Sequence, residues 1–219
     1  MDSFTFRKVE IYDTDLMEQI YRLRFDVYCK ERQFIKEENY PDCLEKDSYD
    51  SQSIHFAAID SEGEAIGAMR LILPGQKKLP VQLYCPDVNI DSQLLRQRQC
   101  AEISRLVISP KLRKSKVPAR YRSLQNTQEP KVRMSDFMRR SRLIALGLHQ
   151  EIAEESKRRG IQEWYSLMEK SLWLLLRIHG FHFHCIGEEV DVFGPVNPYV
   201  YVGNIYSIEE NLNQFAQYP

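Results

Sequence analysis

The chain has 219 residues, of which 43% are hydrophobic and 28% are charged. This balance is typical of a globular protein with one core, so we expect a single domain. No apolar run reaches the roughly 20 residues that a membrane-spanning helix needs, and the first residues lack the apolar stretch of a signal peptide. The five cysteines are scattered and form no C-x-x-C pair, which favours free thiols in a bacterial cytoplasm over a disulfide frame or a zinc site.

The net charge is −1, but the charges are unevenly placed. Basic residues dominate from Lys111 to Arg142, where only Glu129 and Asp136 oppose them. The segment from Glu37 to Asp50 is acidic. Such asymmetry indicates a charged partner or ligand.

The first half of the chain predicts three strands, two of them in a hairpin, and two helices. We expect a strand at Phe4–Tyr12 and then a helix from about Asp15 to Arg32, capped by Asp13 or Thr14. The buried stripe of this helix is Leu16, Ile20, Leu23 and Val27. Residues 31–53 have no apolar period, so we expect a mobile acidic loop at 33–53. A hairpin (Ile54–Asp60 and Glu64–Leu73), a loop or ragged edge (74–86) and a short helix (Asp91–Arg98) follow.

The second half begins with a central strand, Cys100–Pro110, and a basic insertion at 111–134 that lacks periodicity. Ser135 or Asp136 can cap a long helix that ends near Arg159. A strand at Ile161–Met168, an apolar and therefore buried helix at Lys170–His179, and strands at Phe181–Ile186 and Val196–Ile205 complete the chain. The order predicts an α/β or α+β sandwich, with helices on both faces of a mixed sheet.

Two charged residues, Glu102 and Arg105, interrupt the apolar central strand CAEISRLVISP. Burying an unpaired carboxylate or guanidinium is costly, so such residues are usually paired or used. They predict either a structural ion pair that closes the sheet or a functional site. Charged positions upstream that fit the same site favour the second interpretation.

Several common sites are excluded by their missing patterns. His179, His182 and His184 with Cys185 lack the carboxylate or cysteine spacing of a metal centre, so we expect no metal. The absence of glycine between Gly75 and Gly147 excludes a glycine-rich phosphate cradle after the central strand. The basic insertion has one aromatic residue, Tyr121, for base stacking, so we expect no nucleic-acid partner.

Four segments of the first half, RLRFDVYCKERQFI, LEKDSYD, GAMRLILP and AEISRLVI, resemble the N-terminal half of bacterial acyl-homoserine-lactone synthases. Tyr28 stands where those synthases usually have Phe, and Phe34 where they usually have Trp. The second half, from RSRLIALGLHQ to NPYVYV, resembles the acyltransferases associated with PEP-CTERM/exosortase systems and, more distantly, the N-acyl amino acid synthases. The matching positions of the first half are Arg24, Tyr28, Phe34, Glu45, Asp47, Asp50, Arg70, Glu102 and Arg105.

The resemblance implies a GNAT-like three-layer sandwich with a twisted sheet, in which two adjacent strands splay apart and the thioester lies in the gap. By that likeness the splay falls between Cys100–Ser109 and Ile161–Met168. It also implies a β-bulge between Glu102 and Arg105. Because side chains alternate along a regular strand, this bulge would bring both residues to one side and free a backbone N–H for an oxyanion.

We therefore expect transfer of a fatty acyl group from a thioester to a small amine, without an acyl-enzyme. An amine with a pKa of about 8 is largely protonated at neutral pH, so the reaction needs a base. Glu102, with a pKa raised by burial and with a charge partner, is the expected base, and Arg105 is the second catalytic residue. The expected substrate-binding residues are Arg24, Tyr28, Phe34, Asp47, Asp50, Arg70 and Ser104. The alternative for the charged members is a salt-bridge network that only holds the acidic loop.

The expected donor is an acyl-phosphopantetheine thioester on acyl carrier protein rather than on CoA, and no cofactor is permanently bound. The acidic carrier would dock on Lys111, Arg113, Lys114, Arg139 and Arg140. The acceptor is expected to be an amino acid or a related small amine, and any membrane contact would be peripheral, through a lipid product. An acyl-homoserine-lactone synthase, a CoA-dependent acyltransferase and a non-catalytic acyl-binding regulatory module remain open alternatives.

Overall fold

The computed structural model describes residues 4–114, 129–178, 180–192 and 194–201, without the side chains of residues 113, 114 and 129–138. The strands are β1 (Thr5–Val9), β2 (Ser53–Ile59), β3 (Ala65–Ile72), β4 (Cys100–Ile108), β5 (Glu163–Met168), β6 (Phe183–Cys185), β7 (Val190–Asp191) and β8 (Pro195–Tyr201). The α-helices are α1 (Thr14–Phe25), α2 (Pro80–Tyr84), α3 (Ser92–Gln97), α4 (Glu129–Arg159) and α5 (Lys170–Ile178).

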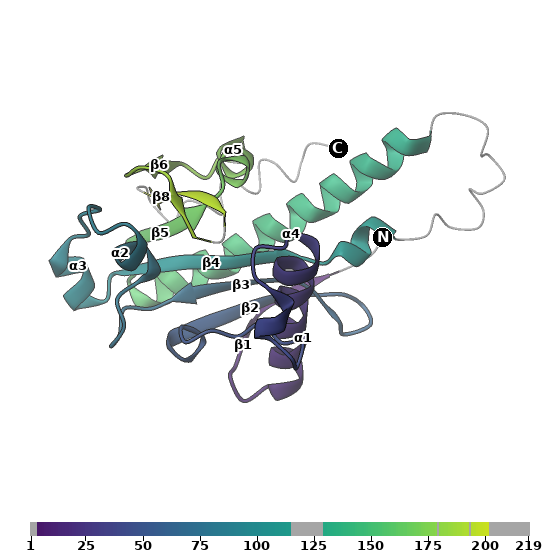
Figure 1. Cartoon of the computed structure of the whole chain (residues 1–219), viewed down its shortest axis with the longest axis horizontal. Helices are drawn as coiled ribbons and strands as arrows, with labels where there is room; N and C mark the ends of the chain where they lie inside the picture. Colours follow the sequence, from purple (N-terminus) through teal and green to yellow (C-terminus); the bar gives the residue numbers. More distant parts are fainter. Residues whose placement is uncertain (1–3, 115–128, 179, 193, 202–219) are drawn as a thin grey trace.

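The strands form one mixed sheet in the order β1-β2-β3-β4-β5-β8-β6, with β7 paired to β8. Strands β1 to β4 are antiparallel, β4 and β5 run parallel, and β8 is antiparallel to both β5 and β6. In Figure 1, α1 lies in front of this sheet and α4 crosses behind it. The predicted sandwich, with helices on both faces of a mixed sheet, is confirmed.

Helix α1 packs on one face of the sheet through the stripe that its periodicity predicts. Leu16, Ile20 and Leu23 are buried, and they contact small side chains of the sheet such as Ala57 and Ala68. Asp13 caps the helix, since its side chain accepts a hydrogen bond from the Leu16 N–H. The helix continues without a break into a π-helical turn, Asp26–Glu31.

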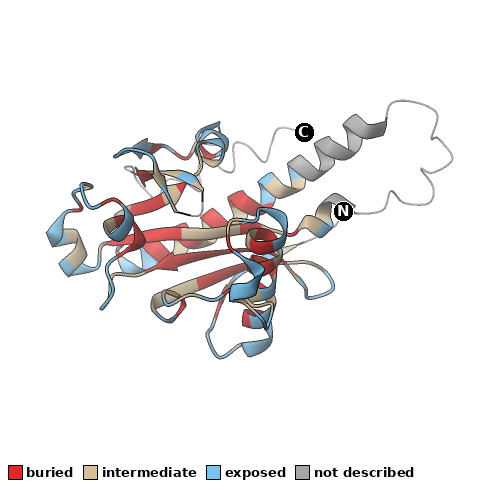
Figure 2. Ribbon diagram, in the orientation of Figure 1, coloured by how far each residue is buried: buried red, intermediate tan, exposed pale blue. Residues whose placement is uncertain are grey.

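Helix α4 covers the other face, where Ile144, Leu148 and Ile152 are completely buried against the sheet. A Cβ atom on Gly67 of β3 would lie 2.5 Å from Ile144 Cγ2, so only glycine lets the helix come this close. Figure 2 shows that the buried residues concentrate in the strands and in the helix faces turned toward them. The core therefore lies on both sides of the sheet.

Three local expectations need correction. Helix α4 begins at Glu129, before the cap expected at 135–136, because Pro130 in its first turn is compatible with a helix start. Segment 74–86, expected to be a loop or ragged edge, contains the short helix α2. Helix α5 was expected to be buried, yet among its described side chains only Leu176 is, since its apolar face borders a cavity instead of the core.

The acidic segment 33–53 contains two short 3-10 helices, Glu37–Asn39 and Asp50–Gln52. Its backbone is joined to α1 through a hydrogen bond from the Glu45 N–H to the Tyr21 carbonyl. Of the helices that the structure describes, none combines the length and the apolar character needed to cross a membrane.

Candidate active site

Strands β4 and β5 pair only at their first residues and then separate. The parallel ladder joins Cys100–Glu102 to Glu163–Tyr165, and beyond it a cavity of about 1020 Å³ opens between the strands. Most of its wall is apolar, with contributions from β4, β5, the π-helical turn after α1, α4 and α5. The splay that the resemblance implied between Cys100–Ser109 and Ile161–Met168 is therefore present.

A β-bulge in β4 turns successive side chains toward this cavity. Ala68 of β3 is paired with Val107, but Arg70 is paired with Ser104, so Met69 lies opposite two residues of β4. Arg105 takes a left-handed backbone conformation, with φ at +57°, at the point of the bulge. As a result Glu102, Ser104 and Arg105 all line the cavity.

Glu102 is the buried carboxyl group of the cavity, with only 1% of its surface exposed. Its Oε2 accepts a hydrogen bond of 2.8 Å from the Val81 N–H, at the start of α2. Burial raises the pKa of Glu102 to about 8, although this N–H and the charges of Arg70 and Arg105 act in the opposite direction. The charge partner expected for Glu102 is not found among the described residues: Glu102 forms no ion pair there, with Arg105 or any other residue, and the Val81 N–H of α2 holds the carboxyl group instead.

The charged residues of the acidic segment do meet Arg24, Arg70 and Arg105 in one cluster. In its inner part, Arg24 Nε binds Glu45, and Arg24 Nη1 donates to Asp50 Oδ1 at 2.7 Å. Arg24 and Glu45 are almost completely buried, and neither lines the cavity. This part fits the alternative of a salt-bridge network that holds the acidic segment against α1.

The outer part of the cluster faces the cavity. Asp47 receives two hydrogen bonds from Arg70, of 2.6 and 2.7 Å, and one of 3.0 Å from Arg105 Nη2. Arg105 also donates to Glu45 from Nε and Nη2. The guanidinium groups hold the pKa of Asp47 well below its usual range against the effect of burial. About a fifth of the Asp47 and Arg105 side chains is exposed, so they are the accessible ends of the network.

Two stacked aromatic residues, Tyr28 and Phe34, lie beside Arg105. The Tyr28 ring stacks on Phe34 with centroids 6.3 Å apart, and the Arg105 guanidinium lies 5.3 Å from the Tyr28 centroid. The Tyr28 hydroxyl donates to the Leu106 carbonyl at the bulge, at 3.3 Å. Both rings line the cavity, and both residues belong to the substrate-binding set predicted from the sequence.

Sequence reasoning missed His55 and left Glu45 out of the expected site. Glu45 matched the synthase pattern, and it bridges Arg24 and Arg105. His55 is buried behind the cluster, with Nε2 3.4 Å from the Asp50 carbonyl, and burial lowers its pKa to about 4. The His55 ring is therefore neutral. What links it to the site is its position in β2 directly opposite Arg70 of β3, which the strand register shows.

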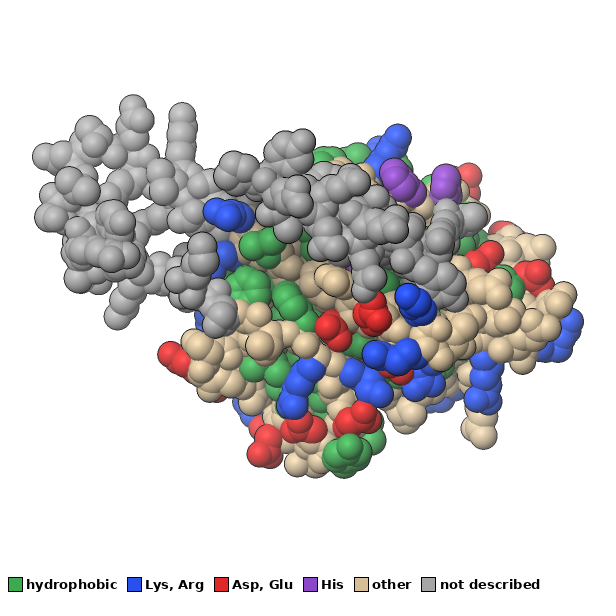
Figure 3. All heavy atoms as spheres, turned by 180° about the vertical axis from the view of Figure 1, so that it is seen from behind, with side chains coloured by type: hydrophobic (Ala, Val, Ile, Leu, Met, Phe, Trp, Pro, Cys, Tyr) green, Lys and Arg blue, Asp and Glu red, His purple; other side chains and the backbone are tan. Residues whose placement is uncertain are grey.

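The residues expected to dock a carrier protein are only partly described. Lys111 and Arg139 are exposed, Arg140 is half-buried, and Arg139 lies at the edge of the cavity. The side chains of Arg113 and Lys114 lie outside the described residues, as does much of the basic insertion. On the face seen in Figure 3, basic and acidic side chains are intermixed.

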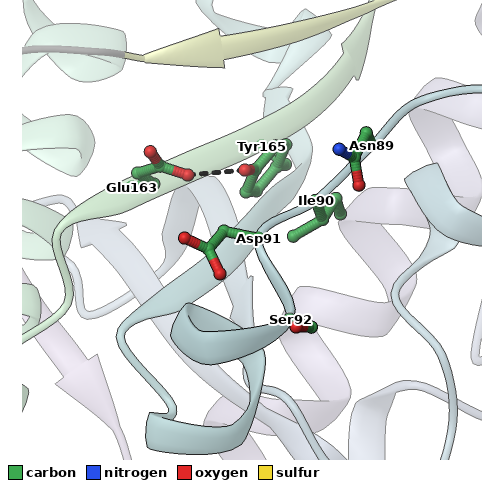
Figure 4. Close-up of a pocket in the computed structure, with 6 residues that line it drawn as sticks. All are labelled: Asn89, Ile90, Asp91, Ser92, Glu163 and Tyr165. Atoms are coloured by element: carbon green, nitrogen blue, oxygen red, sulfur yellow. Dashed lines mark hydrogen bonds between the residues drawn. The ribbon is translucent and has the colours of Figure 1, made fainter.

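A second, more polar pocket of about 430 Å³ lies where β5 begins. Figure 4 shows its lining, in which the Tyr165 hydroxyl donates to Glu163 Oε2 at 2.5 Å. None of the expected site residues lines it. In the described part of the chain, no three His, Cys, Asp or Glu side chains are placed to bind a metal ion.

A family model for an acetyltransferase (GNAT) domain matches residues 23–123. The chain has the GNAT fold. The family match indicates a transferase, and a search of curated proteins gave no match.

Three solved structures illustrate the similarity. TofI, in a complex with an inhibitor and MTA, has 16% identity and a TM-score of 0.63 over 94% of this chain and 96% of its own. The CoA-dependent acyl-homoserine lactone synthase MesI has 15% identity and a TM-score of 0.64 over 98% and 97%. FeeM, an N-acyl amino acid synthase from uncultured soil microbes, has 14% identity and a TM-score of 0.55 over 98% and 99%. At these identities the likeness concerns the fold.

Proposed function

We propose that this protein transfers a fatty acyl group from a thioester to the amine of a small acceptor, by direct attack and without an acyl-enzyme. The observation that carries the proposal is Glu102, a buried carboxyl group in the cavity with a pKa of about 8. A base of this pKa is well matched to an amine nucleophile near neutral pH.

In the proposed reaction, Glu102 accepts a proton from the acceptor amine, directly or through a water molecule. The amine nitrogen then forms a bond to the thioester carbonyl carbon. The carbon–sulfur bond breaks, and the thiolate leaves and is protonated. Arg105, beside the bulge, stabilises negative charge in the same part of the cavity.

Two serines on the strands that line the cavity support direct attack. Ser104 Oγ accepts a hydrogen bond of 2.9 Å from Arg70 Nε, and Ser166 Oγ donates to the Ile103 carbonyl at 3.0 Å. Neither hydroxyl is therefore paired with a base that could make it a nucleophile. No cysteine is among the described residues that line the cavity.

The outer part of the charged cluster supports an amino acid as the acceptor. Asp47 can hold an ammonium group, and Arg105 Nη1 has no hydrogen-bond partner among the described residues. This nitrogen can bind an acceptor carboxylate, whereas Arg24 is engaged by Glu45 and Asp50. The proposed substrate-binding residues are thus Tyr28, Phe34, Asp47, Arg70, Ser104 and Arg105, with Arg24 and Asp50 supporting them.

For the donor we propose acyl carrier protein, an acidic partner suited to Arg139 at the edge of the cavity and to Lys111 on the neighbouring segment Pro110–Lys114. BjaI and MesI are described as CoA-dependent, so CoA remains the second donor to test. A single domain, a cytoplasmic location and a relation to PEP-CTERM/exosortase systems remain predictions of the sequence.

Mass spectrometry of lipid extracts tests the proposal directly. Cells expressing the protein should accumulate new N-acyl amino acids that are missing from cells expressing Glu102→Gln. Acyl-homoserine lactones in their place would make S-adenosylmethionine the acceptor. If purified protein given several acyl carriers, acyl-CoAs and amines releases no thiol, the transferase proposal fails and an acyl-binding module replaces it.

A further inference from the structure

One face of helix α4 places polar atoms in the otherwise apolar part of the cavity. Ser141, Ala145 and His149 follow one another at intervals of four residues, and all three line the cavity. Facing them are apolar side chains of α5 and β6, among them Leu172, Leu176 and Phe183. The proposed acyl transfer needs an apolar compartment for the acyl chain, and this is the part of the cavity that offers one.

The hydrogen bonding of His149 defines the state of its ring. Nδ1 lies 2.7 Å from the Ala145 carbonyl oxygen, and a carbonyl can only accept, so Nδ1 carries the proton. The ring is almost completely buried and lies 4.8 Å from the Phe181 ring. Burial lowers the pKa of His149 to about 4, which keeps the imidazole neutral. Nε2 is then a lone-pair acceptor, and it has no hydrogen-bond partner among the described residues.

An unpaired acceptor in an apolar compartment costs free energy unless a ligand or a water molecule satisfies it. An unsubstituted acyl chain carries no hydrogen-bond donor and would leave Nε2 unpaired. We propose that His149 Nε2 accepts a hydrogen bond from a hydroxyl group on the acyl chain, so that the preferred donor substrate is a hydroxyacyl thioester. This inference rests on the proposed acyl transfer and specifies its donor.

Ser141 provides a matched polar position on the same helix face. Its Oγ is buried without a hydrogen-bond partner. It lies two turns from His149, or about 12 Å along the helix axis, so one hydroxyl group cannot reach both residues. A substitution at Ser141 therefore changes the polarity of the cavity without removing the acceptor at His149.

The test compares thioesters of one chain length, each with a single hydroxyl group at a different carbon, with the unsubstituted thioester. Thiol release is measured for the parent and for His149→Phe, which keeps an aromatic ring against Phe181. We expect the parent to prefer one hydroxylated chain. In His149→Phe, kcat/KM for that chain should fall about tenfold, the usual effect of one buried hydrogen bond, while the unsubstituted chain reacts as well or better. Equal changes for both chains would overturn the inference.

Ser141→Ala is the control, and it should leave the preference for the hydroxylated chain unchanged. If the preference is instead lost in Ser141→Ala and kept in His149→Phe, the assignment to His149 is wrong. Binding of free hydroxylated and unsubstituted fatty acids, measured by calorimetry, separates this inference from the proposed function. Without any thiol release the proposed transfer fails, yet a tighter binding of the hydroxylated acid that His149→Phe abolishes would still support the hydrogen bond.

Discussion

At the scale of single residues, Glu102 is a buried carboxyl group that is not paired with any of the nearby arginines. Three guanidinium groups lie in the neighbouring cluster, but the carboxylates of the acidic segment bind them. Glu102 keeps only the Val81 N–H, which is too little to offset its loss of hydration, so its pKa rises. The cluster thus leaves Glu102 basic enough to accept a proton from an amine.

This raised pKa predicts how stability depends on pH. Between the ordinary pKa of about 4.5 and the folded-state value of about 8, the folded protein binds a proton that the unfolded chain has released. The free energy of unfolding therefore falls as pH rises through this window. Glu102→Gln removes the effect, so its stability relative to the parent should increase from about pH 5 to about pH 9. Urea unfolding of both proteins measures this, and a constant difference across the window would contradict it.

Two arginines that bind the same carboxylate distinguish structural from functional roles. Arg24→Met should lower the free energy of unfolding by about 3 kcal/mol, the low end for breaking a buried ion pair. The loss is limited because Glu45 is still paired with Arg105 and Asp50 is still paired with Arg70. Arg105→Met should cost less stability, since it is partly exposed, but should raise the KM for the acceptor about tenfold.

Denaturant unfolding and steady-state kinetics on both variants separate the two roles. Arg24→Met should keep the parent KM at temperatures where it is folded. If Arg105→Met leaves KM unchanged and is as unstable as Arg24→Met, the whole cluster only holds the acidic segment.

At the scale of the elements, the position of α4 depends on its close approach to β3. Gly67→Ala places a methyl group against Ile144, which is completely buried and has no room to move. We expect a loss of about 1–3 kcal/mol in the free energy of unfolding, as for other overpacked cores. Gly147→Ala on α4 would meet the outer atoms of the half-buried Phe6 ring, which can turn away, and alanine favours a helix.

Gly147→Ala is therefore the matched control and should stay within about 1 kcal/mol of the parent. Thermal and urea unfolding give both values. A larger loss for Gly147→Ala than for Gly67→Ala would show that β1, and not β3, limits the approach of α4.

Periodicity was enough to predict most helices and strands, because buried stripes such as Leu16, Ile20 and Leu23 depend on local geometry. It could not distinguish a side chain in the core from one that borders a cavity, so the burial of α5 was predicted wrongly. The partner of Glu102 was also beyond the sequence: Val81 lies 21 residues away, on a five-residue helix. The splay and the bulge were expected only through the resemblance, because strand pairing is a long-range property.

At the scale of the whole molecule, a net charge of −1 gives little overall attraction to an acidic carrier protein. Encounter must then depend on where the basic groups lie. Lys111 follows β4, and Arg139 lies on α4, which contacts the segment Pro110–Lys114. These two exposed cations therefore come from neighbouring elements, and Arg139 also lines the cavity. On the face seen in Figure 3, acidic and basic side chains are intermixed.

The double reversal Lys111→Glu/Arg139→Glu should raise the KM for an acyl carrier protein about tenfold and affect an acyl-CoA less, because the carrier presents an extended acidic surface. Added salt should weaken the parent's use of the carrier and bring it toward the variant. Lys36→Glu/Lys78→Glu reverses two exposed lysines that lie outside α4 and outside the segment Pro110–Lys114. It makes the same change in net charge and should leave both KM values near those of the parent. If KM for the carrier rises equally in the two double variants, the effect belongs to net charge. If the double reversal raises KM more for acyl-CoA than for the carrier, the two cations bind the nucleotide phosphates. Only a localised docking site makes the choice of donor depend on the positions of the charges.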